Sequence, residues 1–143
     1  HVRLRSGPMD HRPVVRVRLS ITPDPYFKAT ALVFLAFADA EYVADFHQHH
    51  PFDPEGKAVW QSRLKFESVL GAVRRNHYAA AEFDDPPPRF KAAAPVFDEN
   101  DELVAAVGGS LPRDQPDAPR RQLTDLCVKA AARITEQLQA DVP

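Results

Sequence analysis

Five acidic and imidazole side chains lie close together in the sequence and offer metal chemistry: Asp45, His47, His49, His50 and Asp53. Neutral imidazoles and carboxylates are typical zinc ligands, and closely spaced histidines can chelate a metal ion. The spacing does not match the i and i+4 pattern that places two histidines on one helix face. We therefore interpret these residues as part of a solvated polar loop, and we predict no metal site.

Two further residues could act as nucleophiles. Cys127 lies in the apolar stripe of the last expected helix, where a thiol serves as a small hydrophobic core residue. Ser110 follows Gly108 and Gly109, but the segment lacks the flanking residues of a nucleophile elbow and the lysine of a P-loop. No paired-carboxylate, triad or phosphate-loop signature is present either. We predict that the protein is not an enzyme and carries no cofactor.

Length and composition restrict the class of protein further. A chain of 143 residues fits one domain, and 44% hydrophobic with 27% charged residues is typical of a globular protein. The sequence shows no apolar run of membrane-spanning length and no signal-peptide pattern, and a single cysteine excludes an internal disulfide. The net charge of -2 gives no reason to expect nucleic acid along the whole surface. We expect one cytoplasmic domain over residues 1–143 with no membrane contact.

Strands are predicted where apolar residues alternate with polar ones, or where short apolar runs lie between turn signals. They are expected at 2–6, 14–20, 77–83, 89–97 and 103–111. The first two should form a hairpin, because a Gly- and Pro-containing turn separates them.

Helices are predicted from apolar residues at helical spacing and from capping residues. One helix is expected over 26–38, a short one capped by Asp39, and a long one that begins at Asp53-Pro54 and runs to about Arg75. The last is an amphipathic helix whose apolar stripe is Leu123, Cys127, Ala130, Ile134 and Leu138. This order of elements predicts an α+β fold, a curved antiparallel sheet with helices packed on one face.

The predicted pairing of 89–97 with 103–111 gives Lys91 an unusual neighbourhood. If residues 98–101 form the loop, Lys91 pairs with Gly108, and Ser110 lies diagonally across on the same face. A lysine between small residues and a hydroxyl can line a pocket for an anion. The alternative, a lysine on a solvated sheet face, stays open because surface lysines are common in sheets.

Several segments in this order resemble the C-terminal effector-binding domain of IclR-type bacterial transcription regulators. They are Lys28-Ala29-Thr30-Ala31-Leu32, the helix over 56–75 leading into Asn76-His77-Tyr78-Ala79, and Ala93-Ala94-Pro95-Val96-Phe97-Asp98 followed by Val104-Ala105-Ala106-Val107. The resemblance covers about residues 2–139. It implies a curved antiparallel sheet related to GAF and PAS sensor domains, a cup beside the sheet for organic acids or aromatic metabolites, and a homodimer or tetramer.

The resemblance also implies a ligand-binding site, although most of the family's polar contacts are replaced here. The positions that correspond to that site, including the first helix, are Thr30, Phe34, Ala81, Lys91, Gly108 and Ser110. The family's four polar contact positions correspond to Ala81, Lys91, Gly108 and Ser110, and only Ser110 keeps the family's residue. Thr30, in the first helix, is also the residue that the family has. The gain of Lys91 favours a carboxylic acid, while Phe34 favours a ligand with an apolar body.

Three hypotheses about function follow. The leading one is a small-molecule sensing and oligomerisation domain, most consistent with an organic-acid effector, in a regulator that contacts DNA only through a domain not in this chain. The alternative is a degenerate oligomerisation scaffold without a ligand, because three of the four polar contacts are lost. The third is a metal-assisted hydrolase that uses the histidine-rich segment. The family's winged helix-turn-helix is not in this sequence, which is either a piece of a longer protein or a stand-alone relative.

Overall fold

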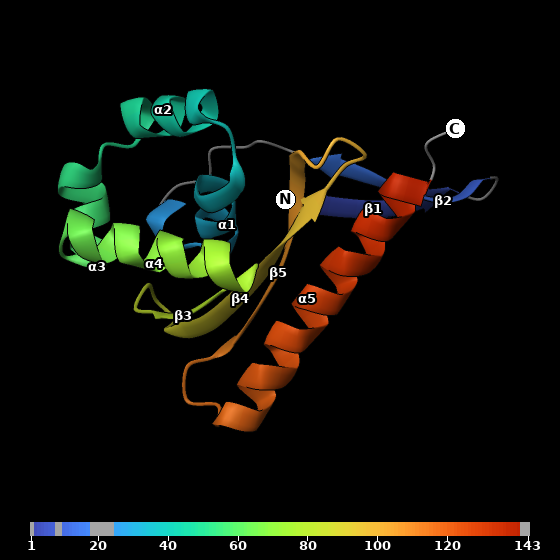
Figure 1. Ribbon diagram of the computed structural model, residues 1–143. Coiled ribbons are helices and arrows are strands. Elements are labelled where there is room, and N and C mark those ends of the chain that lie inside the picture. Colours follow the sequence, from blue (N-terminus) through green and yellow to red (C-terminus); the bar gives the residue numbers. More distant parts are fainter. Residues whose placement is uncertain (1, 8–9, 18–24, 141–143) are drawn as a thin grey trace.

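The computed structural model describes residues 2–7, 10–17 and 25–140 of the chain (Figure 1). A hairpin of β1 (Val2–Gly7) and β2 (Asp10–Val17) comes first. Helices α1 (Ala29–Phe37), α2 (Ala40–His49), α3 (Lys57–Trp60) and α4 (Arg63–Asn76) follow, with single helical turns at Pro25–Phe27 and Phe52–Gly56. The chain ends with β3 (Ala79–Phe83), β4 (Arg89–Phe97), β5 (Leu103–Pro112) and α5 (Asp117–Ala140).

The main sheet has three antiparallel strands in the order β3-β4-β5. This confirms the predicted α+β class with an antiparallel sheet. The first hairpin is antiparallel, as predicted, with Val2 opposite Val17 and Leu4 opposite Val15; residues 18–20 lie outside the described residues. Its second strand begins at Asp10 rather than at residue 14, since Gly7 pairs with Asp10. The hairpin forms a sheet of its own. In the part of the chain that the structure describes, no helix is both long and apolar enough to cross a membrane.

Helices cover both faces of the main sheet, so the expectation of one covered face is wrong. Ala93 of β4 packs with α1 and α4, whereas Ala92, Ala94 and Val96 pack with Cys127 and other residues of α5. Figure 1 shows α5 alone on one side of β4 and β5, with α1 and α4 on the other. The nearly continuous apolar run in β4 explains this, because a strand buried on both faces does not alternate in polarity.

Two glycines in β5 let helices approach the sheet closely from opposite sides. A Cβ atom on Gly108 would lie 2.9 Å from Cγ2 of Thr30 in α1. A Cβ atom on Gly109 would lie 2.7 Å from Cδ1 of Leu123 in α5. Neighbouring strand residues point to opposite faces, so consecutive glycines remove bulk from both. The α1 face is the one that carries Lys91.

The helical segment between the strands departs from the predicted boundaries. The carboxylate of Asp39 accepts a hydrogen bond from the Tyr42 N–H at 2.8 Å, so the predicted cap is confirmed. α2 then continues through His49, which places residues 47–49 in a helix rather than in a loop. The long helix is interrupted at Gln61, whose φ is 71°, and α4 starts from Ser62, whose hydroxyl accepts from the Lys65 N–H. Asp53 caps no helix.

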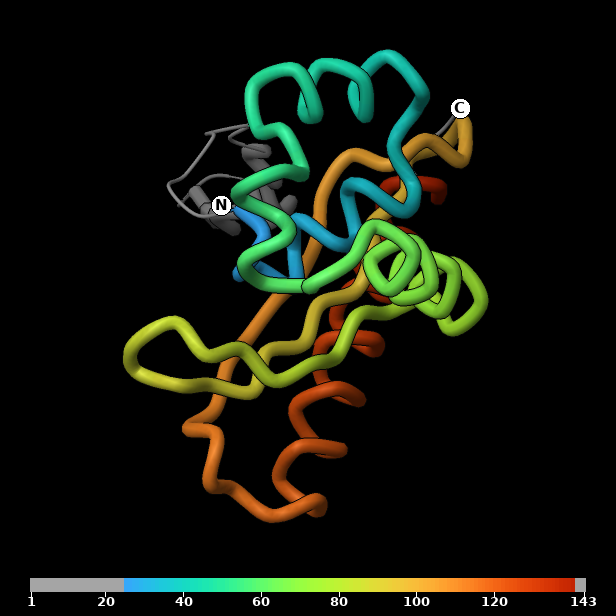
Figure 2. The backbone as a smooth tube through the Cα atoms, turned by 90° about the vertical axis from the view of Figure 1, so that its left-hand side faces the viewer, coloured from blue at the N-terminus to red at the C-terminus, as the bar shows by residue number. Residues whose placement is uncertain are grey.

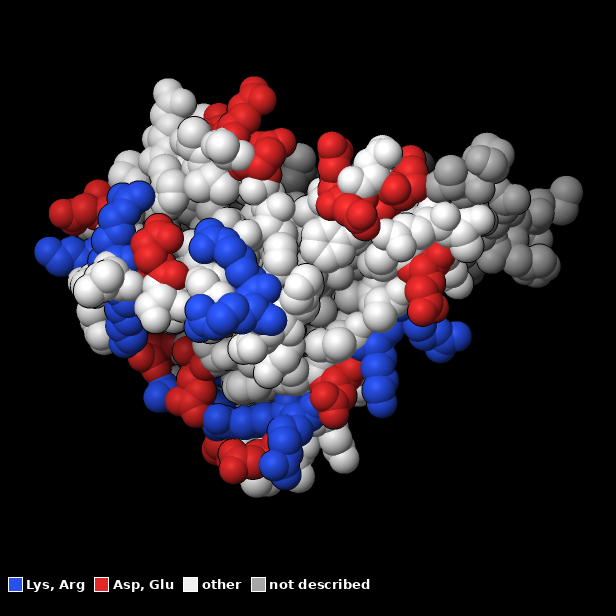
Figure 3. All heavy atoms as spheres, in the orientation of Figure 1, with Lys and Arg blue, Asp and Glu red and all other residues white. Residues whose placement is uncertain are grey.

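The closing helix confirms most of its predicted stripe. Cys127 and Ile134 are buried as expected, and Ala131 is buried where Ala130 was predicted. Leu126, next to Cys127 in the same helix, is 66% exposed. The charged side chains visible in Figure 3 mix both signs across this view of the described surface, in keeping with the net charge of -2.

Candidate functional site

Three of the predicted site residues form one row across the main sheet. Lys91 in β4 lies between Ala81 in β3 and Ser110 in β5. The sequence predicted Gly108 opposite Lys91, but Gly108 pairs with Ala93, and an irregularity between Val96 and Phe97 accompanies this register. The difference is two residues. Because side chains alternate with a period of two, Lys91, Gly108 and Ser110 still share one face, as predicted.

The ammonium group of Lys91 is held inside the site. Its Nζ donates to the main-chain carbonyl of Phe27 at 2.7 Å and to both carboxylate oxygens of Asp85, at 2.9 and 3.1 Å. It also lies 4.9 Å from the centre of the Phe83 ring, within the range of a cation–π interaction. Its side chain is only 16% exposed. Lys91 is therefore a largely desolvated, paired cation rather than a lysine on a solvated face.

The other predicted residues surround this row to different degrees. Thr30 lies beside Gly108, because a Cβ atom added there would be 2.9 Å from its Cγ2, so α1 packs closely on β5. The Ser110 hydroxyl accepts a hydrogen bond from Nε of Arg89 at 2.9 Å and is exposed. Phe34 is half-buried and packs against the ring of Tyr42, with ring centres 5.8 Å apart. The structure therefore brings Thr30, Gly108, Lys91 and Ser110 to one sheet face, and directs Phe34 toward α2.

The N-terminus of α1 lies beside the Lys91 ammonium group. Phe27, whose carbonyl accepts from Lys91, comes directly before Lys28, the N-cap residue of α1. The Lys28 side chain makes no capping hydrogen bond. The positive end of the α1 dipole therefore lies near the Lys91 ammonium, and both favour negative charge nearby.

Sequence reasoning missed Asp85 and Phe83. Asp85 lies in the loop between β3 and β4, six residues before the lysine that it binds. Figure 2 shows this loop in yellow, beyond the end of the sheet that is opposite the β4–β5 loop. The available signal in the sequence is the run Asp84-Asp85-Pro86-Pro87-Pro88, which places two carboxylates in a stiff loop between the strand at 77–83 and the strand that carries Lys91.

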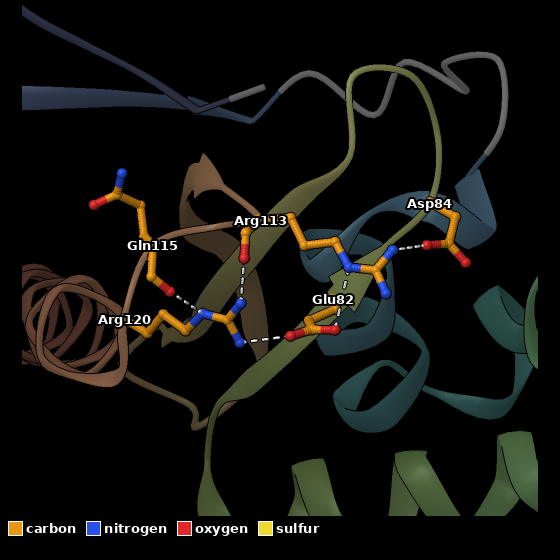
Figure 4. Close-up of polar contacts among 5 residues, drawn as sticks. All are labelled: Glu82, Asp84, Arg113, Gln115 and Arg120. Atoms are coloured by element: carbon orange, nitrogen blue, oxygen red, sulfur yellow. Dashed lines mark hydrogen bonds and ion pairs between the residues drawn. The ribbon is translucent and has the colours of Figure 1, made fainter.

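A second polar network fixes the ends of this loop (Figure 4). Arg113 binds Asp84 and also Glu82, at 3.3 Å from Nε to Oε2. Arg120 of α5 donates to the other oxygen of Glu82 at 2.6 Å and to the Gln115 carbonyl at 3.0 Å. The hydrogen bond from Arg120 holds the pKa of the Glu82 carboxyl below its ordinary value. These contacts connect β3, the β3–β4 loop and the start of α5.

The histidine-rich segment is arranged differently from a chelating cluster. Nδ1 of His49 lies 2.9 Å from the Asp45 carbonyl, and Nδ1 of His50 lies 3.1 Å from a Glu55 oxygen. Burial, aided by the nearby Arg63, lowers the pKa of His47. Within the described residues, no three His, Cys, Asp or Glu side chains are grouped so that they could hold a metal ion.

Cys127 is buried in the cluster between β4 and α5, which confirms its predicted place in the core. Its Sγ lies 3.8 Å from the Ala92 carbonyl oxygen. Burial raises the pKa of the thiol, so the reactive thiolate is disfavoured.

Solved structures of transcription regulators share this architecture. The C-terminal domain of the transcriptional regulator KdgR of E. coli is 22% identical, with a TM-score of 0.66 over 80% of this chain and 71% of that one. IclR of Thermotoga maritima is 21% identical, with a TM-score of 0.66 over 94% of this chain and 53% of that one. A double mutant of the inducer-binding domain of PobR from Acinetobacter, in complex with 3-hydroxybenzoic acid, is 16% identical, with a TM-score of 0.57 over 80% of this chain and 66% of that one.

These matches confirm the resemblance at the level of the fold: the chain has the fold of the C-terminal effector domains of IclR-type regulators. It spans about half the length of the Thermotoga regulator. No protein-family model matches the sequence, and no curated protein matches it.

Proposed function

We propose that this chain is the effector-sensing domain of a transcription regulator and that it binds a small organic anion beside Lys91. The fold supports the regulatory class, because the structures that share it are domains of transcription regulators. The observation that carries the ligand proposal is the desolvated ammonium of Lys91 on the α1 face. A carboxylate that reaches it gains a charge-assisted hydrogen bond, about 1.5–3 kcal/mol.

The surroundings of Lys91 favour an apolar body on that anion. The Phe83 ring lies beside the ammonium group, and Phe27, whose carbonyl binds Lys91, packs against the same apolar cluster as Phe83. We therefore propose a small aromatic or aliphatic carboxylic acid, bound with its carboxylate toward Lys91. A double mutant of the PobR domain was solved with 3-hydroxybenzoic acid, which makes benzoates sensible first probes for this chain as well.

The remaining parts of the proposal concern assembly. We propose a homodimer or tetramer in the cytoplasm that contacts DNA through a domain outside this sequence and has no catalytic role. Among the described residues, β3 is an outer strand of the main sheet with no further strand paired to it, and unpaired strand edges favour association with another chain. Light scattering at micromolar concentration tests this part, and a strictly monomeric protein would count against it.

A scaffold without a ligand is the second candidate, and the pairing of Lys91 favours it. The ammonium group has three N–H donors, and Phe27 and Asp85 supply three acceptor oxygens. A lysine that is already satisfied does not need a ligand.

Calorimetric titration decides between the two candidates. Benzoate, 3-hydroxybenzoate and hexanoate are titrated into the parent protein, Lys91→Ala and Lys65→Ala, with glycerol as a neutral probe. Lys65 is exposed on α4 and donates only to a neighbouring glutamine side chain, so it is a matched control for the loss of a lysine. We expect at least one acid to bind the parent and Lys65→Ala alike, and to bind Lys91→Ala about 10–100-fold more weakly. Binding that is absent throughout, or equal in the parent and Lys91→Ala, leaves the scaffold ahead.

A further inference from the structure

The anion position beside Lys91 is occupied by a carboxylate of the chain itself. Both oxygens of Asp85 accept from the Lys91 ammonium, at 2.9 and 3.1 Å. The third acceptor is the main-chain carbonyl of Phe27, which the Pro25–Phe27 turn and the start of α1 hold in place. Of these partners, Asp85 alone sits on a loop and is attached through a flexible side chain. Its side chain is 34% exposed, twice the exposed fraction of Lys91.

The chemistry of this contact is that of the proposed ligand. A ligand carboxylate would take hydrogen bonds from the same ammonium group, next to the same Phe83 ring. The three N–H groups of Lys91 are already directed to the Phe27 carbonyl and to the two oxygens of Asp85. A ligand carboxylate can accept a hydrogen bond from Lys91 only by taking it from Asp85. A bound effector therefore excludes the present two-oxygen contact with Asp85.

We propose that Asp85 is a tethered competitor: it neutralises Lys91 in the protein without effector, and an effector carboxylate binds by replacing it. This inference rests on the proposed function. A group tethered by a short chain competes at an effective concentration of roughly millimolar, so a ligand must bring more than a carboxylate. Asp85 would thus exclude acetate and similar simple anions, and admit acids whose apolar body adds binding energy.

The adjacent acidic residue provides a matched control. Asp84 carries the same charge one position earlier, but it binds Arg113 and is 80% exposed. Asp84→Asn removes the same charge from the same loop and leaves the partner of Lys91 in place. A general electrostatic effect of the loop would be seen in both variants, whereas competition for Lys91 would be seen only at Asp85.

The test compares benzoate and acetate affinities, by calorimetry, in the parent, Asp85→Asn, Asp85→Ala, Asp84→Asn, Lys91→Ala and Lys91→Ala/Asp85→Asn. We expect both Asp85 variants to bind benzoate about 10–100-fold more tightly than the parent and to gain measurable acetate binding. Asp84→Asn should match the parent, and Asp85→Asn should give no gain when Lys91 is absent. Two Asp85 variants are used so that a folding defect in one, detected by circular dichroism, leaves the other to be measured.

The fluorescence of Trp60 provides a second measurement of binding close to the site. Trp60 is the single tryptophan, and its ring lies 5.9 Å from Phe83, whose ring also contacts Lys91. Its emission should change with the same midpoint as the heat signal. If benzoate binds the parent and Lys91→Ala weakens it, but the Asp85 variants bind equally or more weakly, the tethered-competitor inference is wrong and the proposed function stands. If no variant binds any acid, including Asp85→Asn, both fail.

Discussion

The substitution Gly108→Ala tests the packing that brings α1 to the candidate site. The added Cβ would lie 2.9 Å from Cγ2 of Thr30 and 3.3 Å from the carbonyl oxygen of Ala92. Both distances are shorter than ordinary carbon contacts, and the second involves backbone that cannot turn aside. The φ angle of Gly108 is not positive, so alanine causes no backbone strain there. We expect overpacking to lower the free energy of unfolding by about 1–3 kcal/mol.

Urea denaturation measures this loss, and two further variants identify its cause. Thr30→Ser removes the Cγ2 methyl group that the new Cβ would meet, so Gly108→Ala/Thr30→Ser should regain part of the lost stability. Gly71 lies within α4, where the nearest atom to an added Cβ is the flexible end of Arg75 at 3.4 Å. Gly71→Ala should be neutral or stabilising by up to about 1 kcal/mol, because alanine favours helices. A Gly108→Ala protein as stable as the parent, or one that Thr30→Ser does not improve, would refute close packing of α1 on β5.

Three further predictions concern titratable groups. Burial raises the pKa of Tyr26 from 10.0 to about 12, so the contribution of this residue to stability is complete below pH 10 and is lost toward pH 12. In Tyr26→Phe, the step in tyrosinate absorbance near pH 12 should disappear. Because the hydrogen bond to the His50 carbonyl is also lost, the free energy of unfolding at neutral pH should fall by about 1 kcal/mol. The pKa of Glu82 is lowered by its hydrogen bond from Arg120, so its contribution is present above the ordinary value of 4.5 and is lost below it; Glu82→Gln should flatten the fall in melting temperature in acid. Cys127 has a raised pKa through burial, and iodoacetamide at pH 8 should label it rapidly only in urea; rapid labelling of the native protein would contradict its place in the core.

The parts of the fold that sequence predicted well are those set by local pattern. The bounds of β4 agree with the prediction, because its apolar run lies between the proline triplet and the acidic turn at residues 98–101. The Asp39 cap agrees because capping depends on one side chain and the next turn. The interruption at Gln61 was not predicted, since its left-handed backbone has no glycine to mark it. The helices on both sheet faces were also missed, because the apolar run Ala92–Phe97 in β4 shows no alternation that would indicate a single buried face.

In the candidate site, sequence periodicity predicts which residues share a face but not the contacts that they make. Alternation placed Lys91, Gly108 and Ser110 on one face, and this survived a register error of two residues. What Lys91 does there depends on Asp85 and on the Phe27 carbonyl, 6 and 64 residues away in the chain. Neither contact follows from periodicity, because one is set by a loop and the other by the docking of α1. The resemblance to a family cannot supply them either, because Lys91 lies at a position where this chain departs from the family's polar contacts. The partner of a residue such as Lys91 can therefore be identified only from the structure. Because that partner is Asp85, the open question is which anion can displace the Asp85 carboxylate from Lys91.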